Sequence, residues 1–77
     1  MEVNVEKIKQ LIDEKYRGNQ TFFAETIGFD RHYLNLILNK KIKATSPKLC
    51  RAIINYCLIN KLKKEDYIFF TTMVKKN

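Results

Sequence analysis

A short segment in the middle of the chain carries residue types that are suited to recognition through hydrogen bonds. Leu34, Ile37 and Leu38 recur at the three- and four-residue spacing of a helix and are expected to face the core. With these residues facing the core, the opposite face of the same helix is expected to be exposed to solvent. The side chains expected on its outer face are Arg31, His32, Asn35 and Leu36. Such a face can enter a DNA major groove, and an ordinary solvated helix surface is the alternative.

Two short helices joined by a tight turn are expected to position these residues. The first covers residues 20–27, and the second covers residues 31–39 with Asp30 as its N-cap. Gly28 stands where the chain must reverse direction within a few residues, a position that often requires positive φ. The pattern is that of a helix-turn-helix over residues 20–38, whose second helix can enter a major groove.

Three further helices are expected around this unit. Apolar residues at helical spacing predict helices over residues 5–16, 47–59 and 64–74, and the inner stripe of the second of these includes Leu58. No strand-like alternation is visible, and two glycines and one proline leave little for hairpins. The predicted fold class is therefore all-α, a compact domain of four to five helices that takes up residues 1–77 as a single unit.

Charge is distributed unevenly along the chain. Residues 1–38 carry five basic and six acidic side chains, whereas residues 39–77 carry ten basic and two acidic ones, for net charges of −1 and +8. A one-sided basic field suggests a polyanionic partner, either nucleic acid or an anionic membrane surface. Twelve of the 15 basic residues are lysines, however, and A/T-rich codon usage alone would also produce such a composition.

Several other classes of protein are disfavoured by the sequence. No apolar run approaches the roughly 20 residues of a membrane span, and the first residues lack the apolar core of a signal peptide, so a cytoplasmic location without a membrane partner is expected. Cys50 and Cys57 lie too far apart on one helix for a disulfide and are expected to be buried thiols. No catalytic constellation, phosphate loop or metal cluster is visible. We therefore expect no enzymatic activity, cofactor or small-molecule substrate.

The helix-turn-helix segment resembles that of the phage Cro and phage repressor family, the Xre-like group. The family favours glutamine at the start of its second helix, alanine four residues later, glycine in the turn and aliphatic residues in the third helix. The matching residues here are Gln20, Ala24, Gly28, Leu34 and Ile37, and the start of the next helix at Thr45-Ser46-Pro47 also fits. The resemblance covers about residues 4–70. Many members end the third helix with a glutamate that pairs with an arginine of the first helix, and this pair is absent here.

The resemblance implies a DNA contact for each exposed residue of this unit. Arg31 would read guanine, Asn35 adenine and Leu36 a thymine methyl, with His32 at a further base edge. The residues implied to contact phosphate are Gln20, Thr21, Tyr33, Asn39, Lys40, Lys41 and Lys43. Alternatives stay open, because Tyr33 can pack against the preceding helix, Leu36 can be packing, and the lysines can serve solubility.

The expected function is sequence-specific binding of double-stranded DNA by a small transcriptional regulator of phage or mobile-element type. A module of this size makes a limited contact, so a homodimer or a protein partner is expected to assist it. The candidate surface for that contact is Phe69, Phe70, Met73 and Val74, and capping of the core is the alternative for these residues. The competing function is a protein-binding module, an antirepressor or accessory subunit that uses the same fold to bind another regulator.

Overall fold

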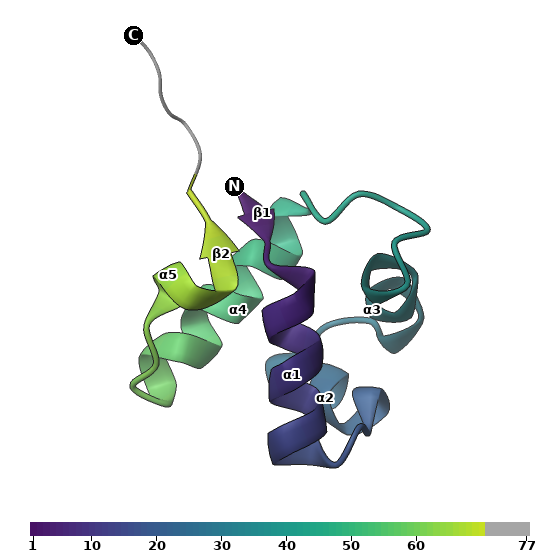
Figure 1. The fold of residues 1–77 in the computed structure, drawn as a ribbon, viewed down its shortest axis with the longest axis horizontal. Helices are drawn as coiled ribbons and strands as arrows, with labels where there is room; N and C mark the ends of the chain where they lie inside the picture. Colours follow the sequence, from purple (N-terminus) through teal and green to yellow (C-terminus); the bar gives the residue numbers. More distant parts are fainter. Residues whose placement is uncertain (71–77) are drawn as a thin grey trace, which may run out of the picture.

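The computed structural model describes residues 1–70 and shows a mostly helical chain with a small two-stranded sheet (Figure 1). Its elements in chain order are β1 (Glu2–Val3), α1 (Val5–Tyr16), α2 (Gln20–Ile27), α3 (Arg31–Leu38), α4 (Pro47–Ile59), α5 (Lys64–Tyr67) and β2 (Ile68–Phe69). The bounds predicted for the first, second and fourth helices are confirmed, and the third ends one residue earlier than predicted, with Asn39 as its C-cap. Among the described residues, no helix is long and apolar enough to cross a membrane.

Side-chain caps determine where the four longer helices begin. Asp30 Oδ2 accepts a hydrogen bond from the backbone N–H of Tyr33 at 2.8 Å, in the first turn of α3. The corresponding caps of α1, α2 and α4 are Asn4, Asn19 and Ser46. Each cap satisfies an N–H group that the helix itself leaves without an acceptor. This is why local sequence alone predicted these starts.

The end of the chain differs from the all-α prediction. The helix expected over residues 64–74 ends at Tyr67, and β2 follows it directly. β2 pairs antiparallel with β1, so that Val3 lies opposite Ile68, and both side chains are buried. The strand pair therefore closes the core where a longer helix was expected. A local pattern of apolar residues does not reveal such a pairing, because its partner lies at the other end of the chain.

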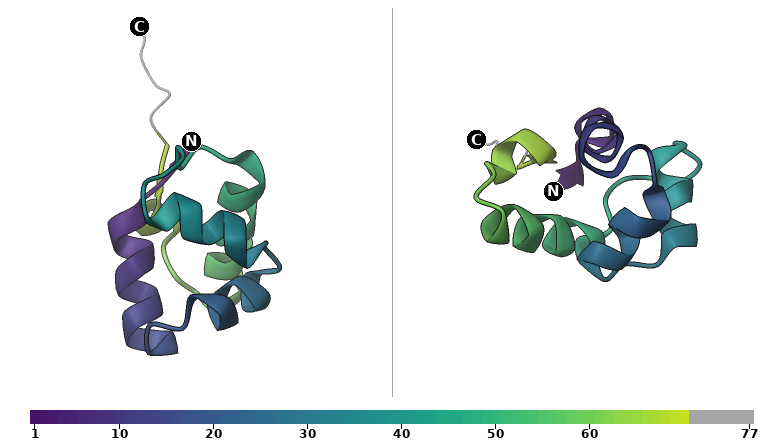
Figure 2. Two further views of the ribbon diagram at one scale, coloured as in Figure 1. Left: turned by 90° about the vertical axis from the view of Figure 1, so that its right-hand side faces the viewer. Right: turned by 90° about the horizontal axis from the view of Figure 1, so that it is seen from below.

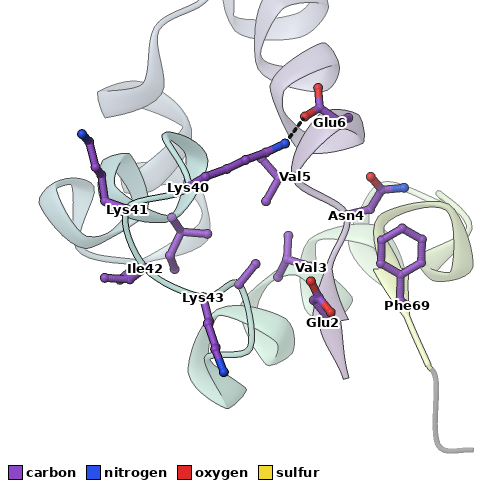
Figure 3. A pocket seen from close by; sticks show the side chains of 12 residues that line it. Glu2, Val3, Asn4, Val5, Glu6, Lys40, Lys41, Ile42, Lys43 and Phe69 are labelled. Carbon is purple, nitrogen blue, oxygen red and sulfur yellow. Dashed lines mark ion pairs between the residues drawn. The ribbon is translucent and has the colours of Figure 1, made fainter.

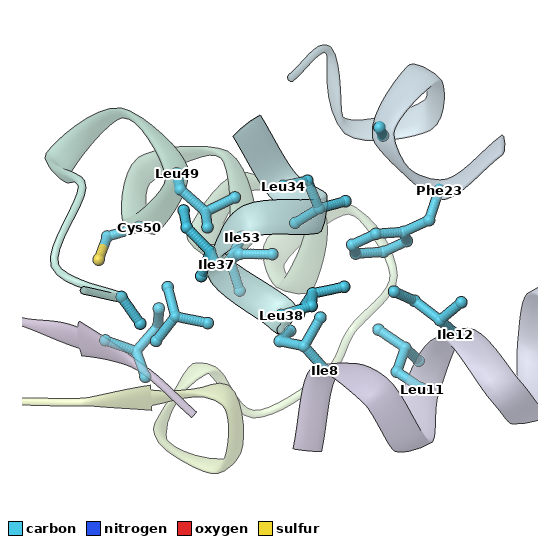
Figure 4. Packing of buried hydrophobic residues seen from close by; sticks show 14 of the residues in the cluster. Ile8, Leu11, Ile12, Phe23, Leu34, Ile37, Leu38, Leu49, Cys50 and Ile53 are labelled. Carbon is cyan, nitrogen blue, oxygen red and sulfur yellow. The ribbon is translucent and has the colours of Figure 1, made fainter. Parts of the chain in front are cut away.

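One apolar cluster joins the helices (Figure 4). α3 contributes Leu34, Ile37 and Leu38, which are all 0% exposed, and they share the cluster with Ile8 of α1 and Phe23 of α2. Burial of these side chains supplies most of the free energy that keeps α3 in place. Because the inner face of α3 is fully occupied in this way, its opposite face is directed to the surface.

α4 departs from its predicted inner stripe in its last turn. Cys50 and Cys57 are buried free thiols, as predicted, and burial raises the pKa of both. Leu58 was predicted to face the core, but it is 77% exposed, and the adjacent Ile59 is 78% exposed. Cys57, one residue earlier, points inward, so the helical rotation turns its two successors outward. Figure 2 shows this end of α4 on the opposite side of the molecule from α3.

Candidate nucleic-acid interface

The outer face of α3 carries three polar side chains next to one another. Arg31, His32 and Asn35 are all exposed, as the helical spacing predicted. Together with Gln20 and Thr21 at the start of α2, they line a hollow of about 300 Å³. The structure thus brings three of the expected base-reading residues together with two of the expected phosphate-binding residues.

The turn between α2 and α3 sets the position of this face. Gly28 has φ +72°, in the left-handed region that glycine adopts without a steric cost. The N–H groups of Gly28 and Phe29 donate to the carbonyls of Glu25 and Ala24, which closes the last turn of α2. Asp30 caps α3 immediately afterwards. The short connection therefore holds the first turn of α3 close to α2.

A hydrogen bond links α2 and α3 within the hollow. Asn35 Nδ2 donates to Gln20 Oε1 at 3.0 Å. The bond occupies the Gln20 carbonyl and one N–H of the Asn35 amide, and it fixes the orientation of both groups. The Gln20 N–H groups and the Asn35 carbonyl with its second N–H remain available to a ligand. The sequence pattern did not predict this bond, because it depends on how the two helices pack.

Tyr33 and Leu36 lie at the margins of this face. The ring of Tyr33 is exposed and meets the ring of Phe29 edge to face, with centroids 5.6 Å apart. The packing alternative for Tyr33 is therefore realised against the turn, whereas α2 had been the expected neighbour. Leu36 is half-buried, so it offers less surface to a ligand than the exposed Arg31.

The chain leaves α3 through a basic loop in which Asn39, Lys40, Lys41 and Lys43 are all exposed. Among residues 1–70, Lys40 alone of these lysines has a carboxylate within 4 Å: its Nζ lies 3.1 Å from Glu6 Oε2 (Figure 3). The hydrogen bond from Lys40 lowers the pKa of the Glu6 carboxyl below its ordinary value. No sequence pattern pointed to Glu6, which lies on α1, and the pair forms only because α1 packs beside the end of α3.

The expected partner surface is only partly within the described residues. Phe69 lies in β2 opposite Glu2, and Phe70 follows it; the two side chains are 45% and 41% exposed. The adjacent Ile68 is buried in the core, whereas these two rings are only partly covered, so both the partner contact and the capping of the core stay predictions for them. Met73 and Val74 lie outside the described residues.

Comparison with models of known protein families, with curated proteins and with solved structures found no match for this chain. Function must therefore be inferred from the chemistry of the exposed surface, since a fold by itself does not determine function.

Proposed function

We propose that the protein binds double-stranded DNA through a helix-turn-helix formed by α2 and α3, in a lambda-repressor-like domain similar to the Cro and phage repressor family. The observation that carries the proposal is the exposed row of Arg31, His32 and Asn35 on the front of α3, around a hollow completed by Gln20 and Thr21. The major groove of B-DNA is wide enough for an α-helix and presents a distinct pattern of donors and acceptors at each base pair. In this proposal the protein is a sequence-specific transcriptional regulator.

Arg31 and Asn35 have complementary chemistry for two different bases. A guanidinium can donate two parallel hydrogen bonds to O6 and N7 of guanine, worth about 1–3 kcal/mol of discrimination. The Asn35 amide keeps a carbonyl and one N–H because its other N–H is bound to Gln20. That remaining pair matches N6 and N7 of adenine. The free N–H groups of Gln20 can meanwhile donate to a phosphate, beside a helix N-terminus that favours anions.

Lys41 and Lys43 supply the sequence-independent part of the proposed binding. Both are exposed, and neither has a carboxylate within 4 Å in the described part of the chain. Each lysine that neutralises a phosphate releases condensed counterions from the DNA, which makes the affinity fall as salt concentration rises. Asn39 and Thr21 would add neutral contacts to the same backbone.

A second module is expected to assist on a two-fold operator, because one small domain buries limited surface on DNA. Phe69 and Phe70 are the exposed candidates for a homodimer contact. Sedimentation velocity with and without a two-fold duplex tests for a second copy of the chain in the complex.

A protein-binding module is the second candidate function, and the end of α4 favours it. Leu58 and Ile59 are two adjacent large aliphatic side chains that are 77% and 78% exposed. This end of α4 lies on the side of the molecule away from α3 (Figure 2). Exposed apolar residues that gather in one place are typical of protein contacts. A partner bound there would leave α3 accessible, so this candidate can coexist with DNA binding or replace it.

A salt titration against a random-sequence duplex distinguishes the two functions. If five phosphates are neutralised, the logarithm of the association constant should fall with the logarithm of salt concentration at a slope of about −4.5. Fluorescence anisotropy with a labelled duplex measures this slope directly. A flat response would reject DNA binding and leave the protein-binding module as the function.

Arg31→Ala tests whether α3 reads bases. On a site selected from a random duplex library, we expect the affinity to fall about 5- to 150-fold, since a bidentate contact contributes about 1–3 kcal/mol. On random duplex the loss should be much smaller and should match that of Arg51→Ala, which removes the same charge from an exposed position on α4. Equal losses for Arg31→Ala on both duplexes would reject the base-reading role.

A further inference from the structure

Residues of opposite charge line a groove behind the end of α3. The groove has a volume of about 600 Å³ and separates β1 and the start of α1 from the basic loop (Figure 3). Lys40, Lys41 and Lys43 belong to the loop side, and Glu2 and Glu6 belong to the opposite side. Two carboxylates therefore lie close to the loop that would approach the DNA backbone.

The five charges are not equally engaged. Lys40 extends across the groove to Glu6, with 3.1 Å between Nζ and Oε2, whereas Lys41 extends away from β1 (Figure 3). Within residues 1–70, Lys41, Lys43 and Glu2 have no opposite charge within 4 Å. Among residues 1–70, the groove thus contains one ion-paired lysine, two lysines without an ion-pair partner and one such carboxylate, Glu2.

The backbone fixes the point from which Lys40 extends. Lys40 has φ +59°, a left-handed conformation that a residue with a Cβ rarely adopts. Its N–H donates to the Ile37 carbonyl at 3.0 Å, and the next N–H, of Lys41, donates to the Leu36 carbonyl at 2.9 Å. These bonds terminate α3 in a Schellman motif and hold the Lys40 backbone in place. The contact with Glu6 is therefore made from an ordered position at the end of a helix.

We propose that Glu6 sets the strength of the sequence-independent attraction to DNA by holding Lys40 away from the phosphates. This inference rests on the proposed function. If Lys40 turned to a phosphate, it would break its ion pair and leave the Glu6 carboxylate without a cation beside the DNA backbone. Repulsion between like charges then adds to the loss of the pair. Lys40 consequently contributes less to binding than the free Lys41 and Lys43.

A lower sequence-independent affinity has a direct use for a regulator. Non-specific sites in a genome outnumber operators by many orders of magnitude, so they compete for the protein even when each is weak. A carboxylate that restrains one cation reduces this competition without touching the base-reading face of α3. The effect of Glu6 on the salt slope would pass through Lys40.

Glu6→Gln is the primary test, because it removes the restraint but keeps the size of the side chain. On random duplex at about 0.1 M salt, the affinity should rise about five- to tenfold, and the salt slope should become steeper by about 0.9, the value for one additional phosphate. Glu2→Gln is the matched control, since it makes the same charge change on the same side of the groove without releasing a lysine. The control should leave the slope unchanged.

A second background assigns the effect to Lys40. In Lys40→Gln protein, the further change Glu6→Gln should not steepen the slope, because no cation is released. Circular dichroism melts verify that each variant is folded. Equal effects of Glu2→Gln and Glu6→Gln, or a steeper slope that persists in the Lys40→Gln background, would overturn the role of Glu6 and leave DNA binding intact. Salt-independent behaviour of the unaltered protein would overturn the proposed function and this role together.

Discussion

α3 and α4 end in the same backbone motif. Each closes with an asparagine C-cap, at φ −91° in α3 and −97° in α4, followed by a lysine in the left-handed region, at φ +59° and +57°. The N–H of the residue after the lysine then donates back into the helix, at 2.9 Å in α3 and 2.8 Å in α4. The two ends are Asn39–Lys40 and Asn60–Lys61. Their backbones are therefore a matched pair.

The side chains of the two ends do different things. In α4 the left-handed lysine is followed by Leu62, which is half-buried and packs against the core. In α3 it is followed by Lys41, which is exposed. Lys40 pairs with Glu6, whereas Lys61 has no carboxylate within 4 Å among residues 1–70. At the position after the left-handed lysine, the same motif thus places an apolar contact at the end of α4 and a charge at the end of α3. The backbone motif specifies how the helix stops, and the residues around it specify what that end can bind.

Replacement of lysines should give the largest difference between the two helix ends, measured as loss of affinity for DNA. Lys41→Gln with Lys43→Gln should lower the affinity for random duplex about 50-fold at about 0.1 M salt and reduce the slope by about 1.8, because two phosphate contacts are lost. The matched double variant Lys61→Gln with Lys63→Gln removes equal charge at the end of α4. Its affinity should change less than about threefold, since screening limits the effect of charges on the far side.

The same anisotropy titration measures both double variants. If they lose affinity equally, the protein responds to net charge alone, and the assignment of the loop after α3 to the DNA backbone is wrong.

For the free energy of unfolding, substitution at the end of α4 should have the larger effect. Leu62→Ala should lower the free energy of unfolding by about 1–2 kcal/mol, below the usual cost for a fully buried leucine because Leu62 is only half-buried. Lys41→Ala at the equivalent position in α3 should change it by less than about 0.5 kcal/mol, as is usual for an exposed residue. Urea unfolding followed by circular dichroism compares the two. A similar cost at both positions would show that the end of α3 is also anchored by packing.

The local part of this fold could be predicted from the sequence, and the long-range part could not. Caps such as Asp30 and breaks such as Gly28 act within a few residues, so the helix bounds followed from them. The pairing of β1 with β2 joins the two ends of the described chain and leaves no local signal. Leu58 illustrates the same limit, because a helical stripe shows which residues share a face but not where the core ends.

In the candidate site, too, local features could be predicted from the sequence and contacts between helices could not. The exposure of Arg31 and Asn35 followed from helical periodicity, since the inner positions of α3 were clearly apolar. The hydrogen bond from Asn35 to Gln20 and the ion pair between Lys40 and Glu6 did not follow, because each joins two helices whose relative placement is set by the core. The sequence therefore predicted which groups are presented, and the packing determines which of them are already occupied.

Glycine in place of the left-handed lysine at each helix end should produce the smallest change, a modest gain in the free energy of unfolding. Lys61→Gly should raise the free energy of unfolding by about 1 kcal/mol, because glycine adopts positive φ without the steric cost of a Cβ. Lys40→Gly should raise it by less, since it also loses the contact with Glu6. Gly28→Ala is the converse control at the end of α2. A Cβ there would have no atom within 4 Å, so its expected loss of about 1 kcal/mol reports backbone strain alone.

Urea unfolding of the three variants tests this order directly. A stabilisation by Lys40→Gly equal to that by Lys61→Gly would mean that the Glu6 contact contributes nothing to folding, at the low end of the range for an exposed ion pair. The pair would then matter only when a phosphate competes for Lys40, and Glu6→Gln would change DNA affinity without changing stability. A loss of stability in Lys61→Gly would instead show that the aliphatic part of that lysine packs against the end of α4, so that the two ends differ in packing even at the shared left-handed residue.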